Sequence, residues 1–194
     1  LEPTDGDAVH GARAMRIVNN GDGWGGLAQE GKVLRPGQEL RFSGWFRGDA
    51  PRPVGLRVHL IAEEDCAAGR WDAPLASADL APAGPSFERR EARLSVPGGF
   101  SGRAVFLLAV EPHAGVTVDA LSLMPADTIN GWRPEVVEAA RRVNPAVIRF
   151  PGGCFASFHD WRESIGPRDE RVPRPSFFWG GLNSNDVGVA EMAG

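Results

Sequence analysis

The first two thirds of the chain contain many short runs in which apolar and polar residues alternate. In the run 54–61, for example, Val54, Leu56 and Val58 fall on one side of the chain. Because successive side chains of a strand point to opposite faces, such runs predict strands with one buried face. About eight of them, separated by turns rich in Gly, Pro and Asp, occur at 13–18, 24–29, 40–47, 54–61, 75–80, 87–96, 103–110 and 116–124. Residues 1–125 are therefore predicted to form an antiparallel β-sandwich of the jelly-roll type.

The pattern changes near residue 126. Pro134 stands where the first turn of a helix accepts a proline. Residues 135–143 then place acidic side chains early and arginines late, as the helix dipole favours. Residues 147–150 are apolar and β-branched apart from one arginine, which predicts a short buried strand. Since a helix followed by a buried strand is typical of a barrel or an open α/β sheet, residues 126–194 are predicted to be a second domain.

Arg149 lies one residue before the end of that predicted strand and is followed by Pro151, Gly152 and Gly153. A buried arginine needs a carboxylate or several oxygen acceptors for its five N–H groups. The proline removes a backbone donor and the glycines allow unusual backbone angles, so the chain is expected to turn sharply. Ligand sites of α/β proteins lie at such strand ends. Pro-Gly-Gly on its own is more often an ordinary strand-ending turn.

A longer series of motifs favours a site. It consists of Arg-Phe-Pro-Gly-Gly-Cys-Phe (149–155), Asp-Trp (160–161), Ile-Gly-Pro-Arg-Asp-Glu-Arg (165–171), Trp179, Asn-Asp-Val-Gly (185–188) and Glu191. From about Pro145 to Glu191 this series resembles the family-51 glycoside hydrolases, the α-L-arabinofuranosidases. The β-rich part that ends at 118–125 is similar to the subgroup with a carbohydrate-binding-like sandwich before the catalytic domain. The resemblance implies that residues 126–194 are the early portion of a TIM (β/α)8 barrel, with the barrel incomplete.

The resemblance also implies roles for three residues in binding substrate. Arg149 stands where the family's arginine helps to hold the active-site carboxylates. Cys154 stands where a residue touches the bound arabinose, although many members have Asn there. Trp179 falls near an aromatic platform for the neighbouring sugar, which suits the apolar C–H face of a pyranose; it could equally pin the loop 156–181. Asp160 is expected to orient the loop backbone or Arg168.

The catalytic carboxylates of the family are expected to lie outside this chain. Retaining glycosidases need two carboxyl groups about 5–5.5 Å apart, one acting as acid and one as nucleophile. In the family the acid/base is a Glu directly after an Asn, and no Asn-Glu pair occurs in the 194 residues. The chain is therefore interpreted as an internal fragment that is inactive alone. The parent would hydrolyse terminal non-reducing α-L-arabinofuranosyl residues of arabinoxylan or arabinan with retention and without a cofactor.

Composition excludes other classes of function. The net charge of −4, without a basic stripe carrying aromatic residues, argues against nucleic-acid binding. No apolar run is long enough to cross a bilayer. Cys66 and Cys154 are expected to be free thiols in different domains, and their spacing from histidines does not match a zinc site. The sequence leaves open an extracellular or cytoplasmic location and a homo-oligomer of the full-length enzyme.

Two alternatives of another class concern the sandwich, which could bind polysaccharide without catalysis or only stabilise the barrel as an interaction domain. The aromatic candidates for sugar binding are Trp24, Trp45 and Trp71. Trp45 is predicted to lie in the core because it stands in a strong strand with Phe42 and Phe46. Trp71, in a polar loop, is the candidate expected to be exposed.

Overall fold

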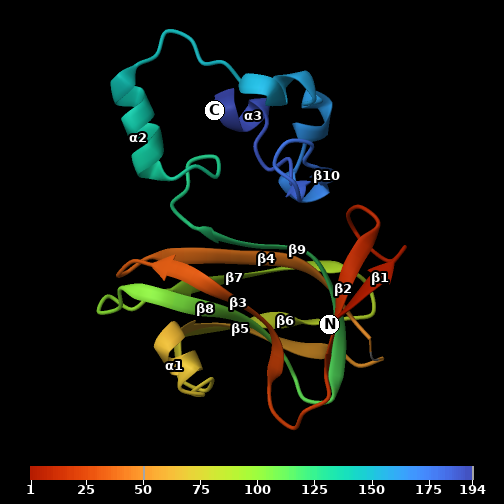
Figure 1. The fold of residues 1–194 in the computed structure, drawn as a ribbon. Coiled ribbons are helices and arrows are strands. Elements are labelled where there is room, and N and C mark those ends of the chain that lie inside the picture. Colours follow the sequence, from red (N-terminus) through yellow and green to blue (C-terminus); the bar gives the residue numbers. More distant parts are fainter. Residues whose placement is uncertain (50, 194) are drawn as a thin grey trace. The chain divides into compact units, whose positions relative to one another are not determined.

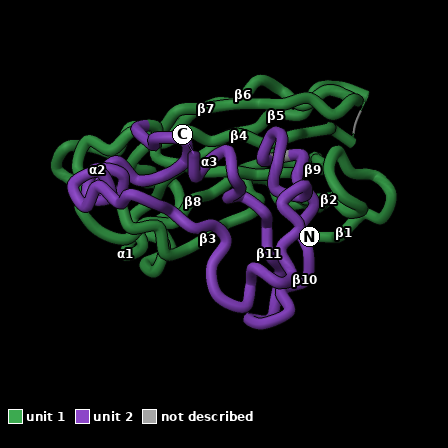
Figure 2. The backbone as a smooth tube through the Cα atoms, turned by 90° about the horizontal axis from the view of Figure 1, so that it is seen from above, with its two compact units in different colours: residues 1–126 green, residues 127–194 purple. Residues whose placement is uncertain are grey.

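A computed structural model describes residues 1–49 and 51–193 (Figure 1). The chain divides into two compact units, Leu1–Ala126 and Asp127–Gly194, which Figure 2 colours separately. Each unit has its own kind of interior.

Unit 1 is a sandwich of two antiparallel sheets (Figure 1). The five-stranded sheet has the order β1 (Glu2–Asp5), β2 (Arg13–Asn19), β9 (Ala114–Pro125), β4 (Glu39–Gly48) and β7 (Glu88–Ser95). The four-stranded sheet has the order β3 (Gly25–Leu34), β8 (Gly102–Val110), β5 (Val54–Ala62) and β6 (Pro74–Ala83). The predicted antiparallel sandwich is thus confirmed. The sequence did not predict β1, a polar edge strand, or the short helix α1 (Glu63–Ala67).

The core lies between the two sheets and follows the alternation of the sequence. On β5 the side chains of Val54, Leu56, Val58 and Leu60 are all at most 2% exposed. Phe42, on β4 of the other sheet, packs on Phe106 of β8 with a ring-centroid distance of 5.1 Å. Aromatic rings from facing sheets therefore meet across the sandwich, where burial of apolar surface supplies the main stabilisation.

Trp45 is not part of this core, so that prediction was wrong. Phe42 and Phe46 are at most 1% exposed and point inward. Trp45 stands an odd number of residues from each of them, and the period of two places it on the outer face of β4. There its indole is half-buried and meets the ring of His10 edge-on, with centroids 6.0 Å apart.

The outer face of the five-stranded sheet is partly covered by the segment that follows β1. The Asp119 carboxylate on β9 accepts hydrogen bonds from the backbone N–H groups of Val9 and His10, at 2.8 and 2.9 Å. Arg47 of β4 makes a bidentate ion pair with Asp7. These contacts hold the segment against the sheet beside Trp45.

Unit 2 is mostly irregular. It contains the helices α2 (Pro134–Val143) and α3 (Val189–Ala193), the 3-10 turns η1 (Gly153–Ser157), η2 (Trp161–Ser164) and η3 (Arg168–Glu170), and the two-residue strands β10 (Arg174–Pro175) and β11 (Leu182–Asn183). The predicted helix at 135–143 is confirmed, and it ends as expected at Asn144, which has a left-handed φ of 46°. No residue of α2 is buried, and Val143 is 76% exposed.

The predicted buried strand at 147–150 does not form. Val147 is 82% and Ile148 60% exposed, and Arg149 is exposed as well. A strand needs neighbours for its backbone N–H and C=O groups, and the described residues offer none to this segment. No part of a TIM barrel is therefore shown by the described chain.

Substitutions of an inward and an outward valine test which side chains of the four-stranded sheet face the core. Val58→Ala removes two methyl groups from a fully buried site and is expected to destabilise the sandwich by about 2–3 kcal/mol. Val33→Ala, on β3 of the same sheet, changes a side chain that is 74% exposed and should cost less than about 1 kcal/mol. Urea unfolding followed by circular dichroism measures both, and equal losses would contradict the assigned faces.

Candidate functional site

The buried arginine of unit 2 is Arg171 and not Arg149. Its side chain is only 2% exposed. Nε and Nη2 donate to the carbonyl oxygen of Gly166 at 3.1 and 2.7 Å, and Nη1 donates to that of Asn185 at 3.0 Å. The two Nη atoms also donate to the carboxylate of Glu191, at 3.0 and 2.8 Å. All five N–H groups of the guanidinium are thus used, as burial of an arginine demands.

Glu191 is the anionic half of this ion pair. Besides Arg171, its carboxylate accepts the backbone N–H of Gly188 at 2.7 Å, and the Nε of Arg168 lies 3.5 Å away. Hydrogen bonds from Arg171 and then the Gly188 N–H, against an opposing effect of burial, together lower the pKa of Glu191 to about 2. The carboxylate is therefore ionised at neutral pH and held in one place.

The ion pair ties together segments that are distant in sequence. Trp132 donates its indole N–H to the carbonyl oxygen of Glu191 at 3.0 Å. Asn185, only 3% exposed, donates to the carbonyl oxygen of Val172 at 2.9 Å. Gly188 packs so closely on Ser164 that an added Cβ would lie 2.1 Å from its carbonyl oxygen. The interior of unit 2 is thus polar and hydrogen-bonded.

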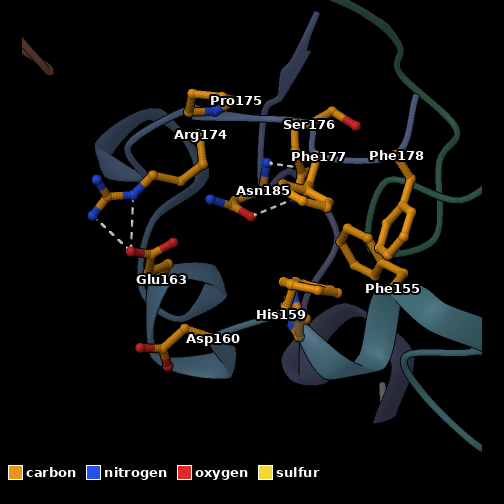
Figure 3. A pocket seen from close by; sticks show the side chains of 12 residues that line it. Phe155, His159, Asp160, Glu163, Arg174, Pro175, Ser176, Phe177, Phe178 and Asn185 are labelled. Carbon is orange, nitrogen blue, oxygen red and sulfur yellow. Dashed lines mark hydrogen bonds and ion pairs between the residues drawn. The ribbon is translucent and has the colours of Figure 1, made fainter. Parts of the chain in front are cut away.

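A small hollow opens beside this interior (Figure 3). One side is polar, where Arg174 pairs with Glu163 at 2.6 Å and Asp160 lies nearby. The other side is aromatic, with Phe155 and Phe178 labelled in Figure 3. Its volume of about 50 Å³ is enough for a few waters, whereas ligand pockets usually measure about 300–1,000 Å³. The hollow does not enclose a sugar ring.

The three residues predicted to bind substrate are all exposed, and none of them lines the hollow. Trp179 is 84% exposed, and its backbone N–H donates to the hydroxyl of Ser176 at 3.3 Å. Arg149 makes no hydrogen bond or ion pair with any residue that the structure describes, so its predicted burial against acceptors was wrong. Cys154 is an exposed free thiol in η1. Their role in substrate binding stays a prediction.

Asp160 does orient the loop backbone, as predicted. Its carboxylate caps η2 by accepting the N–H of Arg162 at 3.0 Å. It does not pair with Arg168, whose guanidinium donates to the carbonyl oxygen of Asn130 instead. Gly131 leaves the space for that contact, because an added Cβ would clash with the Arg168 guanidinium.

No signal in the sequence predicted that Arg171 and Glu191 form a buried pair. Both stand in the motifs that carried the resemblance, but an arginine in a polar string gives no periodic signal of burial. Within the described residues, no group of three or more His, Cys, Asp or Glu is placed to hold a metal ion. None of the helices described is long and apolar enough to cross a membrane.

Comparisons with known proteins concern mainly unit 2. Residues 139–194 match the family model described as the alpha-L-arabinofuranosidase 1 domain. A probable alpha-L-arabinofuranosidase C of Aspergillus fumigatus is 40% identical over 68 residues, which is 35% of this chain and 14% of that protein. An exo-alpha-(1->6)-L-arabinofuranosidase of Bifidobacterium longum is 39% identical over 64 residues, 33% of this chain and 12% of that protein. The end of the chain is thus similar to part of arabinofuranosidases, and the chain spans about a seventh of such relatives' length or less.

The sandwich is similar to a solved carbohydrate-binding module. The CBM22-1 xylan-binding domain of Paenibacillus barcinonensis Xyn10C superposes with a TM-score of 0.50 at 10% sequence identity. The match covers 66% of this chain and 81% of that one. At this identity the likeness concerns the fold alone.

The buried ion pair predicts how unit 2 responds to mutation. Glu191→Gln leaves the guanidinium of Arg171 buried without a counter-ion and is expected to destabilise unit 2 by roughly 2–3 kcal/mol at pH 7. Glu163→Gln removes an ion pair that is partly exposed to solvent and should cost less than about 1 kcal/mol. Hydrogen exchange of peptides from 160–193 checks both variants.

The same pair predicts a pH dependence with a definite sign. The folded-state pKa of Glu191, about 2, lies below its ordinary value of 4.5. Its stabilising contribution is therefore complete above pH 4.5 and is lost as the pH falls towards 2. The loss of hydrogen-exchange protection caused by Glu191→Gln should therefore become smaller as the pH falls over this range, once the rates are corrected for the pH dependence of intrinsic exchange. A difference that stays constant down to pH 2 would contradict the assignment.

Proposed function

We propose that the chain is an internal part of an α-L-arabinofuranosidase of family 51. The intact enzyme would hydrolyse terminal non-reducing α-L-arabinofuranosyl residues of arabinoxylan or arabinan with retention of configuration. The observation that carries the proposal is the match of residues 139–194 to the arabinofuranosidase domain, the region that contains Arg171 and Glu191. Similarity to relatives that act on arabinofuranosides supports the same reaction class.

The proposed domain arrangement is a carbohydrate-binding-like sandwich at 1–125 followed by the early portion of a TIM barrel at 126–194. The exposed apolar surface of unit 2 supports the second part. Val143, Val147 and Ile148 are all at least 60% exposed, along a helix and the extended segment that follows it. Barrel strands are buried on both faces, so neighbouring strands and helices of a longer polypeptide would cover such side chains.

In the intact enzyme, Arg149, Cys154 and Trp179 would contribute to the substrate site. Their exposure supports this, because none is committed to a partner in the interior of unit 2. The guanidinium of Arg149 would hold the catalytic carboxylates, the thiol of Cys154 would contact arabinose, and the Trp179 indole would stack on the next sugar. The exposed position of all three agrees with a pocket that further chain completes.

The two catalytic carboxyl groups would be supplied by polypeptide beyond these residues. In unit 2 the carboxylate of Glu191 is held by Arg171, that of Glu163 by Arg174, and that of Asp160 caps η2. A retaining hydrolase needs one carboxyl group that protonates the leaving oxygen and another that attacks the anomeric carbon. No cofactor takes part in these steps.

An activity assay tests this function. The 194-residue chain should not turn over p-nitrophenyl α-L-arabinofuranoside, whereas a polypeptide extended at both ends should hydrolyse it with retention. In the extended enzyme and with an arabinoxylan oligosaccharide, Trp179→Ala should raise KM roughly tenfold, because it removes a stacking surface. Trp161→Ala, at another exposed tryptophan, is the control and should leave KM unchanged.

Two results would contradict the proposal. Turnover by the purified 194-residue chain would show that the catalytic groups lie within it. An extended polypeptide that is folded but inactive on every arabinofuranoside would refute the hydrolase itself.

A second candidate function concerns the sandwich, which we propose holds polysaccharide without catalysis. Two tryptophans on its surface favour this: Trp24 is 39% and Trp71 45% exposed, and Trp71 was the one expected to be so. Exposed indoles are suited to sugar rings because they offer a flat apolar surface with one N–H donor.

Affinity electrophoresis decides between binding and a purely stabilising role of the sandwich. Soluble arabinoxylan in the gel should retard the 194-residue chain relative to a gel without it. Equal mobility in both gels would leave the sandwich as an interaction domain that stabilises the catalytic part.

A further inference from the structure

The two outer faces of the sandwich differ in what covers them. The segment after β1 lies on the outer face of the five-stranded sheet, where Asp119 and Arg47 hold it. On the outer face of the four-stranded sheet, Gly26, Ala28 and Ser77 are exposed. The helix α1 contacts β5 and β8 at one end of this face, where Ile61 and Val105 are at most 1% exposed. The rest of this second face is therefore the sheet surface that a ligand could reach.

The strand register arranges the side chains of this open face in rows. One row runs across the four strands as Gly26, Ala109, Arg57 and Asp79, and the next as Ala28, Leu107, His59 and Ser77. The positions on β3 and β8 are small or aliphatic, with Ala109 fully buried and Leu107 partly exposed, whereas those on β5 and β6 are polar. The face therefore has a low apolar side next to a row of hydrogen-bonding groups.

Trp24 stands at one end of these rows and contacts the polar side. The guanidinium of Arg57 lies over its indole, 4.1 Å from the ring centroid. The same guanidinium pairs with Asp79 through Nε and Oδ1 at 2.7 Å. Gly55 leaves room for the indole, since an added Cβ would lie 3.2 Å from Cη2 of Trp24. The aromatic ring, the guanidinium and the carboxylate are thus held in fixed relation.

His59 and Ser77 extend the polar side along the next row. Nδ1 of His59 lies 2.7 Å from the hydroxyl oxygen of Ser77. Burial, and then the charge of Arg57, lower the pKa of His59 below its ordinary value of 6.5. The imidazole is therefore neutral at pH 7, and a neutral imidazole offers one donor and one acceptor, as a sugar hydroxyl does.

The charges of the face indicate what kind of ligand fits it. Arg57 is paired with Asp79, so the row carries no net charge. A site for an acidic polymer would instead need cations free to meet carboxylates or phosphates. Planar polar groups already oriented beside an indole match a neutral sugar, whose hydroxyls need hydrogen bonds and whose C–H face needs an apolar surface.

We propose that the outer face of the four-stranded sheet binds a neutral polysaccharide built of pyranose rings, such as a xylan backbone. The chain of sugars lies along the low side of the face, over β3 and β8. Its ring faces contact Trp24, and its hydroxyls bond with Arg57, Asp79, His59 and Ser77. This inference rests on the polysaccharide-binding role proposed for the sandwich and is independent of the hydrolase activity.

Affinity electrophoresis of the 194-residue chain in gels containing soluble arabinoxylan tests the site. Dissociation constants are obtained from the dependence of the electrophoretic mobility on the polymer concentration. Trp24→Ala removes the indole, and Ala28→Arg places a long side chain on the low side without removing any polar group. Each should weaken binding roughly tenfold or more. Trp71→Ala tests the competing candidate, the similarly exposed tryptophan of another loop; if the site lies on the open face, this variant should change the constant less than about twofold. Polygalacturonate, an acidic polymer, should not retard the unmodified chain.

Thermal unfolding shows whether each variant is folded. If Trp24→Ala unfolds at a clearly lower temperature than the unmodified chain, the binding of Ala28→Arg tests the site instead. Binding lost in Trp71→Ala but kept in the other two variants overturns the site and leaves the polysaccharide-binding role intact. An unmodified chain that arabinoxylan does not retard overturns both. Tighter binding of polygalacturonate than of arabinoxylan overturns the assignment of a neutral ligand.

Discussion

The structure of unit 2 depends on one buried ion pair. Arg171 and Glu191 are almost fully enclosed, and every N–H of the guanidinium has an oxygen partner. Burial of two charges is costly, and here the cost is offset by complete hydrogen bonding. The pair joins the turn at Gly166, the buried Asn185 and the start of α3. Unit 2 is thus ordered by polar contacts, while many of its apolar side chains remain on the surface.

Unit 1 is instead ordered by apolar contacts in its interior, with its polar groups on the surface. Its interior is apolar, and its charged groups pair on the outer faces. One face is partly covered by the segment after β1, and the other presents Trp24 and a neutral polar row. A stable sandwich that leaves part of one sheet face open can serve as a binding surface, whereas a unit with exposed Val147 and Ile148 presents apolar side chains that further polypeptide would cover. The two units therefore point to different roles, one as a binding surface and the other as a part that further polypeptide completes.

The sequence predicted the sandwich well because alternation is a local signal and each run contributes an inward face by itself. The same rule of alternation places Trp45 on the outer face, since it stands an odd number of residues from Phe42 and Phe46. Residues 147–150 have the composition of a strand, but pairing partners are a property of the whole sheet and no local pattern supplies them. Arg171 escaped notice for a related reason: its burial follows from a carboxylate twenty residues away, Glu191, and from the carbonyl oxygens of two turns.

The central claim is that residues 126–194 are an early part of a barrel whose remaining strands would cover 147–150. Hydrogen exchange of the peptide 146–152, measured both in the 194-residue chain and in an extended polypeptide, tests it most directly. The account predicts rapid exchange in the short chain and strong protection in the extended one, where Ile148 and Arg149 gain neighbouring strands. Equally rapid exchange in a folded, extended polypeptide would contradict it.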